Sequence, residues 1–384
     1  MNKNIYREST VLKAKILSYG FRMSEKVKPL INERVKEEHR GYGDSHWGVE
    51  KDAKIPAEIM LPGEIVVATH IRPNSHLCLE VKNNKPIMIE NGNKISDVDF
   101  IDRPKIWSKT TKSGINMKKI ANFYGRDCLN FNIYSGCEFW DKGLPCKFCS
   151  VKPTQLRYGE VEIKKTVKDI SEVAKLAFKI EDKINFVIVT GGSYLDGDRE
   201  INEVIPVLNE IRGAIPESWK GIIRGNVALM APQNIEKIDE LMATGIEHPS
   251  FNLEVWGRRY FNYMCPGKAR YRGLDHILET YKYGVEKYGR GKFWVNFVGG
   301  LNSLDALKNG FSYVAKLGVV PGANIFHPDV GSILGKKRKS PSPEYIVQLF
   351  RHAAKLYHKY DYLPFFDEKC LRNSIANEAY LGYV

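Results

Sequence analysis

The alternation of strand-like apolar runs with amphipathic stretches over residues 129–327 constrains the fold more than any other feature of the chain. Apolar runs of strand length lie at 129–134, 184–190, 220–229, 250–256, 293–299 and 323–327. Amphipathic stretches of helical length lie at 167–180, 201–211, 235–243, 274–287 and 306–316. Repeated strand and helix units predict an α/β fold with a parallel sheet, which right-handed crossovers curl toward a barrel. The carboxyl ends of the strands carry the active site in such a fold.

Two flanking regions have a different pattern. Helical periodicity up to Gly20, followed by short apolar runs broken by proline, glycine and asparagine, predicts an N-terminal α+β cap over residues 1–125. The barrel domain is predicted over 126–330. An amphipathic helix at 345–360 and an aromatic tail predict a C-terminal extension, 331–384, that packs on the barrel.

Composition narrows the class of protein. The chain of 384 residues is 43% hydrophobic and 27% charged, as in ordinary globular proteins. Its apolar runs are far shorter than the ~20 residues needed to cross a bilayer. Its first 28 residues lack the apolar core of a secretory signal, so we expect a cytoplasmic protein. The net charge of +13 suits acidic substrates or nucleic acid, although the basic run at 336–339 has the composition of a solvated loop.

Cysteines cluster directly after the first predicted strand. Cys137, Cys146 and Cys149 form a C-x8-C-x2-C pattern. Thiolates at such spacing are ligands for zinc or an iron–sulfur cluster. A fourth cysteine, Cys128, would complete a structural zinc site, but it precedes the strand and lies on the order of 20 Å from the loop at ~3.3 Å per residue. Three thiolates on a four-iron cluster leave one iron open for another ligand.

This loop resembles that of the radical S-adenosylmethionine (radical SAM) superfamily. Members hold a [4Fe–4S] cluster on three cysteines after the first strand of a partial (βα)6 TIM-like barrel, usually spaced C-x3-C-x2-C. Phe148 occupies the family's aromatic position before the last cysteine, whereas the first gap is widened to eight residues. The resemblance implies that Cys137, Cys146 and Cys149 bind the cluster and that S-adenosylmethionine binds its open iron.

Later strand ends extend the resemblance. Gly191 and Gly192 match the family's Gly-Gly-Glu motif, in which the backbone receives the methionine amino group, but Ser193 replaces the acid. Asn252 and Glu254 are similar to the Asn-x-Asp motif of the biotin-synthase-like branch, and strand alternation puts both on one face. Further implied cofactor contacts are Lys268 or Arg270 at the methionine carboxylate, and Asn296, Gly299 and His327 around the adenine.

The resemblance implies an enzyme that reductively cleaves S-adenosylmethionine and uses the 5′-deoxyadenosyl radical to take hydrogen from a small polar or acidic metabolite. Rearrangement, bond cleavage, ring formation and methyl transfer all stay open. An external electron donor, flavodoxin-like or ferredoxin-like, is implied. The alternatives are a radical SAM enzyme acting on nucleic acid, suggested by the charge, and a structural zinc protein.

Several other residues have two interpretations. Cys265 could donate a hydrogen atom to a substrate radical or be an inert buried thiol, and Cys370 is equally open. His327 could instead be a hydrogen-bonded core histidine. Arg224, Arg258 and Arg259 are candidates to bind an acidic substrate group or are surface residues.

Overall fold

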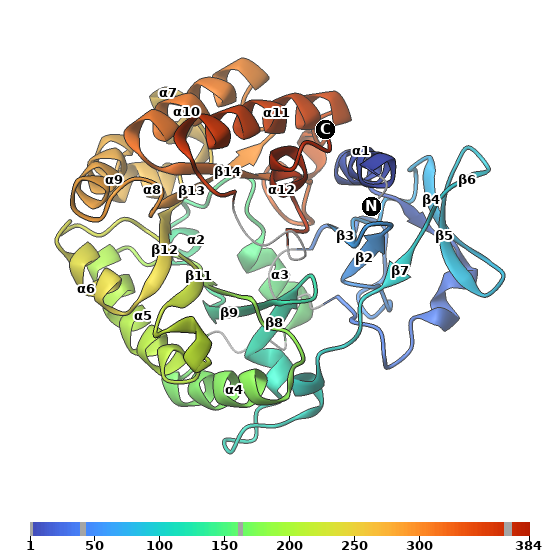
Figure 1. The fold of residues 1–384 in the computed structure, drawn as a ribbon, viewed down its shortest axis with the longest axis horizontal. Coiled ribbons are helices and arrows are strands. Elements are labelled where there is room, and N and C mark those ends of the chain that lie inside the picture. Colours follow the sequence, from blue (N-terminus) through green and yellow to red (C-terminus); the bar gives the residue numbers. More distant parts are fainter. Residues whose placement is uncertain (1–2, 39–43, 160–163, 365–370) are drawn as a thin grey trace.

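A seven-stranded sheet curls around a central space in the computed structural model, which describes residues 3–38, 44–159, 164–364 and 371–384 (Figure 1). The strand order is β14-β13-β12-β11-β10-β9-β8. Neighbours pair in parallel, except that β8 and β9 are antiparallel. The strands are β8 (Ala121–Tyr124), β9 (Cys128–Tyr134), β10 (Phe186–Gly191), β11 (Ile223–Leu229), β12 (Ile246–Phe251), β13 (Trp294–Gly299) and β14 (Val320–Ile325). The predicted partial barrel is confirmed.

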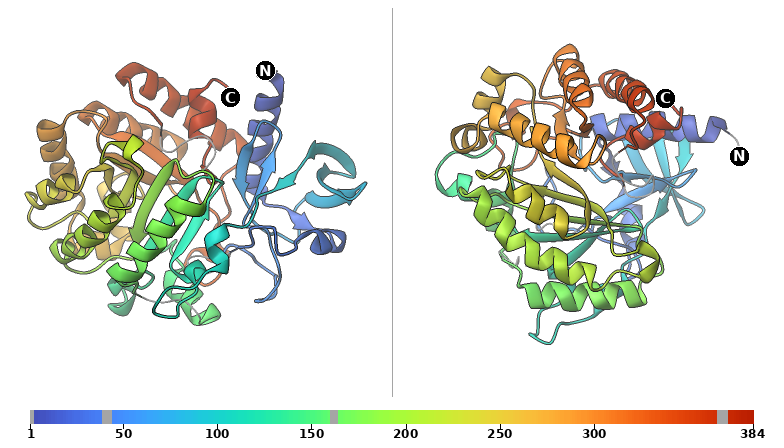
Figure 2. Two further views of the ribbon diagram at one scale, coloured as in Figure 1. Left: turned by 60° about the horizontal axis from the view of Figure 1, so that its bottom comes forward. Right: turned by 60° about the vertical axis from the view of Figure 1, so that its left-hand side comes forward.

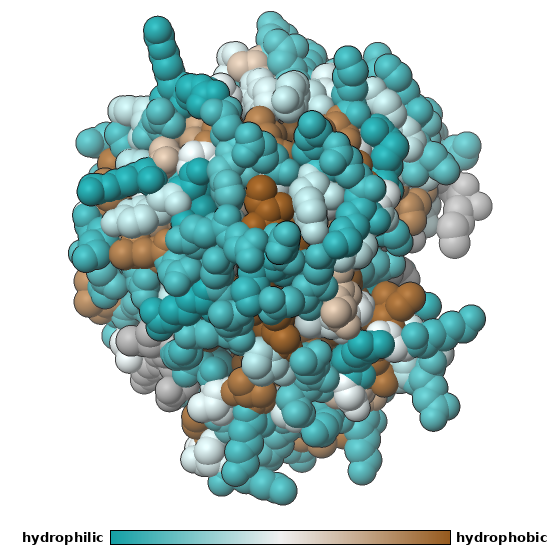
Figure 3. All heavy atoms as spheres, turned by 90° about the vertical axis from the view of Figure 1, so that its left-hand side faces the viewer, coloured by the Kyte–Doolittle hydropathy of each residue, from teal (hydrophilic) through white to brown (hydrophobic). Residues whose placement is uncertain are grey.

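Helices cover the convex side of this sheet (Figure 2). They are α4 (Val167–Ile180), α5 (Gly197–Arg212), α6 (Lys237–Ala243), α9 (Leu274–Tyr288), α10 (Leu304–Leu317) and α11 (Pro343–Tyr360). In α4 the Thr166 side chain caps the first turn by accepting from the Asp169 N–H, and Ile170, Val173 and Ala177 are buried at helical spacing. The face of the molecule where α6 and α9 lie is mainly hydrophilic, with hydrophobic residues scattered singly (Figure 3).

The fourth barrel strand differs from the prediction in position. It was predicted at 250–256 but runs from Ile246 to Phe251. The strand ends there because the backbone turns sharply: Glu254 has a left-handed φ of 65°, and the Val255 N–H donates to the Leu253 carbonyl at 2.7 Å. Similarly, the sixth strand lies at Val320–Ile325 rather than at 323–327.

Short helices that the sequence pattern did not predict lie at the carboxyl ends of the strands. They are α2 (Glu138–Asp141), α3 (Val151–Tyr158), α7 (Arg258–Met264) and α8 (Pro266–Tyr271). Lys268 lies inside α8, ahead of the long helix α9. Phe139 of α2, Val151 of α3 and Lys268 of α8 line a common cavity.

The region before β8 combines helix and sheet and lies beside the barrel, on the opposite side from α6 and α9 (Figure 1). Its helix α1 (Lys3–Tyr19) ends at Gly20, as predicted. One sheet has the order β3-β2-β7 and the other β1-β4-β5-β6. Their strands are β1 (Arg22–Met23), β2 (Glu58–Leu61), β3 (Ile65–Ala68), β4 (Leu77–Lys82), β5 (Lys85–Glu90), β6 (Asn93–Asp97) and β7 (Asp99–Phe100).

Residues 371–373, ahead of the last helix, α12 (Ala376–Tyr380), join this N-terminal region to the free edge of the barrel sheet. The Ile325 N–H of β14 donates to the Asn373 carbonyl at 2.9 Å, and the Ala68 N–H of β3 donates to the Arg372 carbonyl at 3.1 Å. At the other edge, the Lys36 ammonium donates to the Gly125 carbonyl, beside β8, at 2.6 Å. The N-terminal and C-terminal segments therefore close the open side of the half-barrel. Phe365, Phe366 and Cys370 of the predicted tail lie outside the described residues.

Among the residues that the structure describes, no helix combines the length and the apolar character needed to cross a bilayer.

Candidate active site

The three predicted cluster ligands line one cavity at the carboxyl ends of β9 and β10. Cys137 directly precedes α2, and Cys146 and Cys149 follow it in a turn closed by the Cys149 N–H and the Cys146 carbonyl at 3.0 Å. The widened first gap forms α2, whose Phe139 ring packs 5.9 Å from the Tyr271 ring. The inserted residues thus form a short helix beside the three cysteines, and Phe139 of this helix lines the same cavity.

Burial sets the protonation of these thiols. It raises the pKa of Cys137 and of Cys149 above the ordinary value. A hydrogen bond with the Cys265 thiol, together with burial, raises the pKa of Cys146 well above its ordinary value. A metal centre that binds these thiols must therefore displace their protons. Cys265 itself is buried and lies next to Cys146.

The fourth cysteine considered for a structural zinc site lies away from the cysteine loop. Cys128 begins β9, at the opposite end of the strand from the cysteine loop. Among the described residues, no three histidine, cysteine or acidic side chains converge on one point at which a single metal ion could bind. A structural zinc site needs four such ligands around one ion, whereas a four-iron cluster spreads its thiolates over different irons.

Gly191 and Gly192 bring β10 against the cysteine loop. The Gly192 N–H donates to the Tyr134 carbonyl at 2.7 Å. A Cβ atom on Gly192 would lie only 1.5 Å from the Gly136 carbonyl oxygen, so no larger residue fits there without movement of one loop. Both glycines line the same cavity as the cysteines, and their backbone is accessible to a ligand.

Glu254 and Lys268 form a buried ion pair in this cavity. Their charged atoms are 2.6 Å apart, and the Lys268 ammonium also donates to the Asn252 carbonyl at 2.8 Å. Burial lowers the pKa of Lys268, but Glu254 and the neighbouring thiols raise it above its ordinary value overall. Asn252 and Glu254 do face one cavity, although the left-handed turn at Glu254, and not strand alternation, puts them there.

A larger cavity of about 370 Å³ continues from this site into the half-barrel. Phe148, Cys149, Asn252 and Glu254 line both cavities. The walls of the larger one carry an amide on each of four consecutive strands: Asn226, Asn252, Asn296 and Asn324 belong to or directly follow β11 to β14. These amides offer hydrogen-bond donors and acceptors on successive strands of the cavity wall.

Two predicted cofactor contacts lie elsewhere. Arg270 is exposed, with its guanidinium 5.8 Å from the Tyr271 ring centroid, and does not line either cavity. Gly299 faces away from the half-barrel, because a Cβ there would meet Leu349 of α11 at 3.3 Å. Arg258 pairs with Asp275 on the surface, and Arg224 lies 5.5 Å from the Trp219 ring centroid.

The N-terminal region contributes a histidine that the sequence did not indicate. The His70 ring lies 4.3 Å from the ring of His327, which lines the larger cavity as predicted. His327 Nδ1 is 2.7 Å from Asp329 Oδ1, and the Ser150 hydroxyl donates to Asp329 Oδ2 at 2.8 Å. Burial holds the pKa of His70 well below its ordinary value, so this imidazole is neutral. Contacts that run from His70 through His327 and Asp329 thus link the N-terminal region to Ser150, the residue after Cys149.

Two buried charged residues at the cavities were also missed. Glu200, in the first turn of α5, lines the cavity of the cysteines. Arg372 lines the larger cavity and a narrower pocket beside β8 and β9. Acidic residues are common in the first turn of a helix, so Glu200 did not stand out in the sequence. Arg372 belongs to no recognisable motif.

No family model matches the chain. Bacteriochlorophyllide c C-7(1)-hydroxylase of Chlorobaculum limnaeum is 23% identical over 247 residues, which cover 61% of this chain and 61% of that protein, so the chain spans less than two thirds of the length of this curated relative. Among solved structures, methylornithine synthase is 12% identical, with a TM-score of 0.44 over 65% of this chain and 71% of that one. A radical SAM methyltransferase from Sphaerobacter thermophilus is 12% identical, with a TM-score of 0.40 over 75% of each chain.

Likeness at this level of identity and TM-score identifies no activity. The geometry of the chain's own residues therefore carries the functional conclusion.

Proposed function

We propose that this protein is a radical SAM enzyme. The observation that supports this most directly is the gathering of Cys137, Cys146 and Cys149 in one cavity with Gly191 and Gly192, at the carboxyl ends of a curled parallel sheet. The cysteines and the glycines belong to two separate motifs, and the fold brings both to one place. The barrel architecture puts that place where active sites form.

The residues present fit a [4Fe–4S] cluster with bound S-adenosylmethionine. The three cysteines would hold the cluster, and the glycine pair, Asn252 and the Glu254–Lys268 pair would face the ligand. Bound together, the two groups supply a one-electron cleavage that yields a 5′-deoxyadenosyl radical able to take hydrogen from a substrate. The electron would come from an external donor, flavodoxin-like or ferredoxin-like, in the cytoplasm.

The chain's own residues would position the reactants and exclude water. Lys268 forms an ion pair with Glu254 and so provides a positive charge beside this carboxylate inside the site. The N-terminal region and residues 371–373 cover the open side of the half-barrel, which keeps bulk water from the cavity. Reactive intermediates survive longer in such an enclosure.

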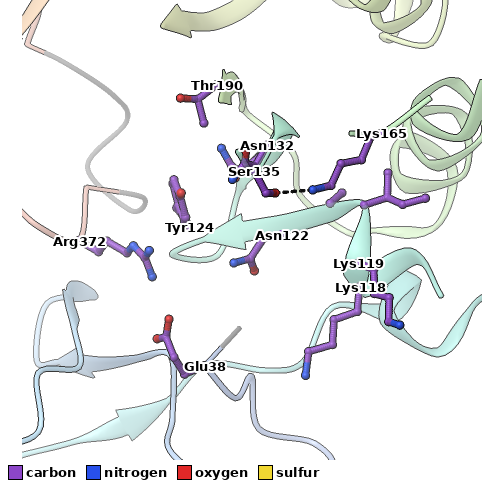
Figure 4. A pocket seen from close by; sticks show the side chains of 13 residues that line it. Glu38, Lys118, Lys119, Asn122, Tyr124, Asn132, Ser135, Lys165, Thr190 and Arg372 are labelled. Carbon is purple, nitrogen blue, oxygen red and sulfur yellow. Dashed lines mark hydrogen bonds between the residues drawn. The ribbon is translucent and has the colours of Figure 1, made fainter. Parts of the chain in front are cut away.

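Arg372 supports a small polar or acidic metabolite as the substrate. Its Nη1 donates to Glu58 Oε1 at 3.0 Å, and no other described residue accepts a hydrogen bond from its side chain. The guanidinium reaches the pocket beside Tyr124, opposite Glu38 (Figure 4). The remaining N–H groups can receive a carboxylate, which a guanidinium binds in a fork geometry. Thr69 Oγ1 and His70 Nε2, both buried at the larger cavity and without a partner among the described residues, offer further hydrogen bonds.

Anaerobic reconstitution with iron and sulfide tests the proposal. We expect a brown protein with about four irons per chain, which releases 5′-deoxyadenosine when dithionite and S-adenosylmethionine are added. C146A should lose the cluster and the product, because one thiolate ligand is gone. C128A should keep both, since Cys128 begins β9 and lies outside the loop. A colourless wild-type protein containing zinc, or product release by C146A, would contradict the assignment.

A further inference from the structure

Glu200 is a buried carboxylate without a counter-ion. Its residue is 4% exposed and lines the cavity together with Gly191, Gly192 and Ser193. Among the described residues, no lysine, arginine or histidine nitrogen forms an ion pair with it. Burying a carboxylate is costly unless a positive charge and hydrogen bonds compensate for the lost water.

Backbone hydrogen bonds hold this carboxylate in place. Oε2 accepts from the Tyr194 N–H at 3.1 Å, and Oε1 accepts from the Met230 N–H at 2.9 Å. These donors belong to the segments that follow β10 and β11, so Glu200 is fixed between two strand ends at the rim of the site. Each oxygen still has a lone pair available for another donor.

The two nearest cations are engaged elsewhere. Lys268 pairs with Glu254 at 2.6 Å. Arg272 donates to the carbonyls of Ala231, at 2.6 Å, and of Leu195, at 3.1 Å. Burial accordingly dominates and raises the pKa of Glu200 to about 7, while these two cations lower it only in part. The cavity thus contains a carboxyl group that has backbone hydrogen bonds but no ion-pair partner among the described residues.

We propose that Glu200 is the counter-ion for the α-ammonium group of S-adenosylmethionine. This inference rests on the proposed function. Glu200 supplies from α5 the carboxylate that Ser193 does not supply at the third position of the glycine motif. The ammonium group can donate to a carboxylate oxygen while the backbone around Gly191 and Gly192 contacts the rest of the amino acid moiety, and the ligand's positive charge then offsets the buried negative one.

Ligand binding measured with and without the amino group tests this role. The reconstituted protein is titrated anaerobically, by calorimetry, with S-adenosylmethionine and with its analogue in which hydrogen replaces the amino group. For E200Q we expect S-adenosylmethionine to bind at least tenfold more weakly than to wild type, the loss typical of a charge-assisted hydrogen bond. The analogue should bind E200Q and wild type within about twofold, because it has no ammonium group to lose.

E203Q is the matched control. Glu203 lies one turn further along α5, pairs with Lys164 at 2.8 Å and with Arg199 at 3.2 Å, and does not line the cavity. Its replacement should leave both affinities unchanged. Iron content per chain is measured for every variant, so that a lost cluster is recognised directly.

Each outcome decides a separate question. Equal binding of S-adenosylmethionine to E200Q and wild type would overturn the role of Glu200. A similar loss of both ligands in E200Q would also overturn it, because a residue that only ties the two strand ends together would affect both alike. Failure of the iron-loaded wild type to bind S-adenosylmethionine would instead overturn the proposed function, and this inference with it.

Discussion

Glu200 should make the free energy of unfolding depend on pH. Burial raises its pKa from the ordinary value of 4.5 to about 7, so the folded chain holds this proton more strongly than the unfolded chain. The proton's contribution to folding is therefore fully present below about pH 4.5 and is lost as the pH rises through about 7. Relative to E200Q, wild type should lose up to about 3 kcal/mol of unfolding free energy between pH 5 and 8.

Urea denaturation of the cluster-free chain at several pH values measures this difference. E203Q again serves as the control, because Glu203 has cationic partners and its pKa is lowered, which places its transition at lower pH. If the difference in unfolding free energy between wild type and E200Q stays constant from pH 5 to 8, Glu200 is ionised in the folded chain over that whole range.

Residues that belong to motifs could be predicted from sequence, whereas residues that complete the site from elsewhere could not. The cysteines, the glycine pair, Asn252 and Lys268 follow particular strands at short range, and each lines the cavities. Glu200 and Arg372 reach the cavities from other segments, one from the start of α5 and one from the C-terminal segment. Their role depends on which loops meet, and local spacing does not contain that information.

At the element scale, hydrophobic periodicity predicted the long helices well because burial on one face determines them. The fourth strand was misplaced because apolar residues continue past its end: Leu253 and Val255 are buried in the turn around Glu254, as they would be in a strand. A glycine at a position with positive φ would have indicated a turn, whereas Glu254 at this position does not.

Gly192, in the turn after β10, lies so close to the cysteine loop that we expect no side chain to fit at this position. In G192A the new Cβ would lie 1.5 Å from the Gly136 carbonyl oxygen and 3.0 Å from Cys137 Cβ, so the two loops must separate. We expect a loss of about 1–3 kcal/mol of unfolding free energy, as for other overpacked sites. The iron bound per chain after reconstitution should fall by at least half, because Cys137 moves with its loop.

A second glycine offers a control for this substitution. Gly213, after α5, has an ordinary φ of −70°, and its new Cβ would lie 3.5 Å from the nearest carbonyl oxygen. G213A should therefore keep wild-type stability and iron content, both measured under the same conditions. Full iron loading of G192A would show that the two loops can part without disturbing the cysteines.

At the scale of the whole molecule, a buried charge cluster joins the N-terminal region, the barrel and the C-terminal segment. Glu58 of β2 forms an ion pair with the Lys36 ammonium at 2.6 Å and accepts from Arg372 Nη1 at 3.0 Å, and the side chains of Lys36 and Glu58 are fully buried. Lys36 also donates to the Phe123 carbonyl of β8 at 3.0 Å. The Glu58 carboxylate thus connects parts of the chain that are more than three hundred residues apart in the sequence.

E58Q should therefore be strongly destabilising, because it leaves Lys36 and Arg372 buried without their shared negative charge. Breaking a buried pair in this way typically costs about 3–5 kcal/mol of unfolding free energy.

The exposed pair of Glu64 and Arg126 provides the comparison. Their charged atoms are 2.5 Å apart, yet E64Q should cost less than about 1 kcal/mol because water screens both groups. Urea midpoints of the two variants, measured on the same preparation of cluster-free chain, give the comparison directly. Equal midpoints for E58Q and E64Q would mean that the charge cluster does not hold the three parts of the molecule together, and that the apolar core alone closes the half-barrel.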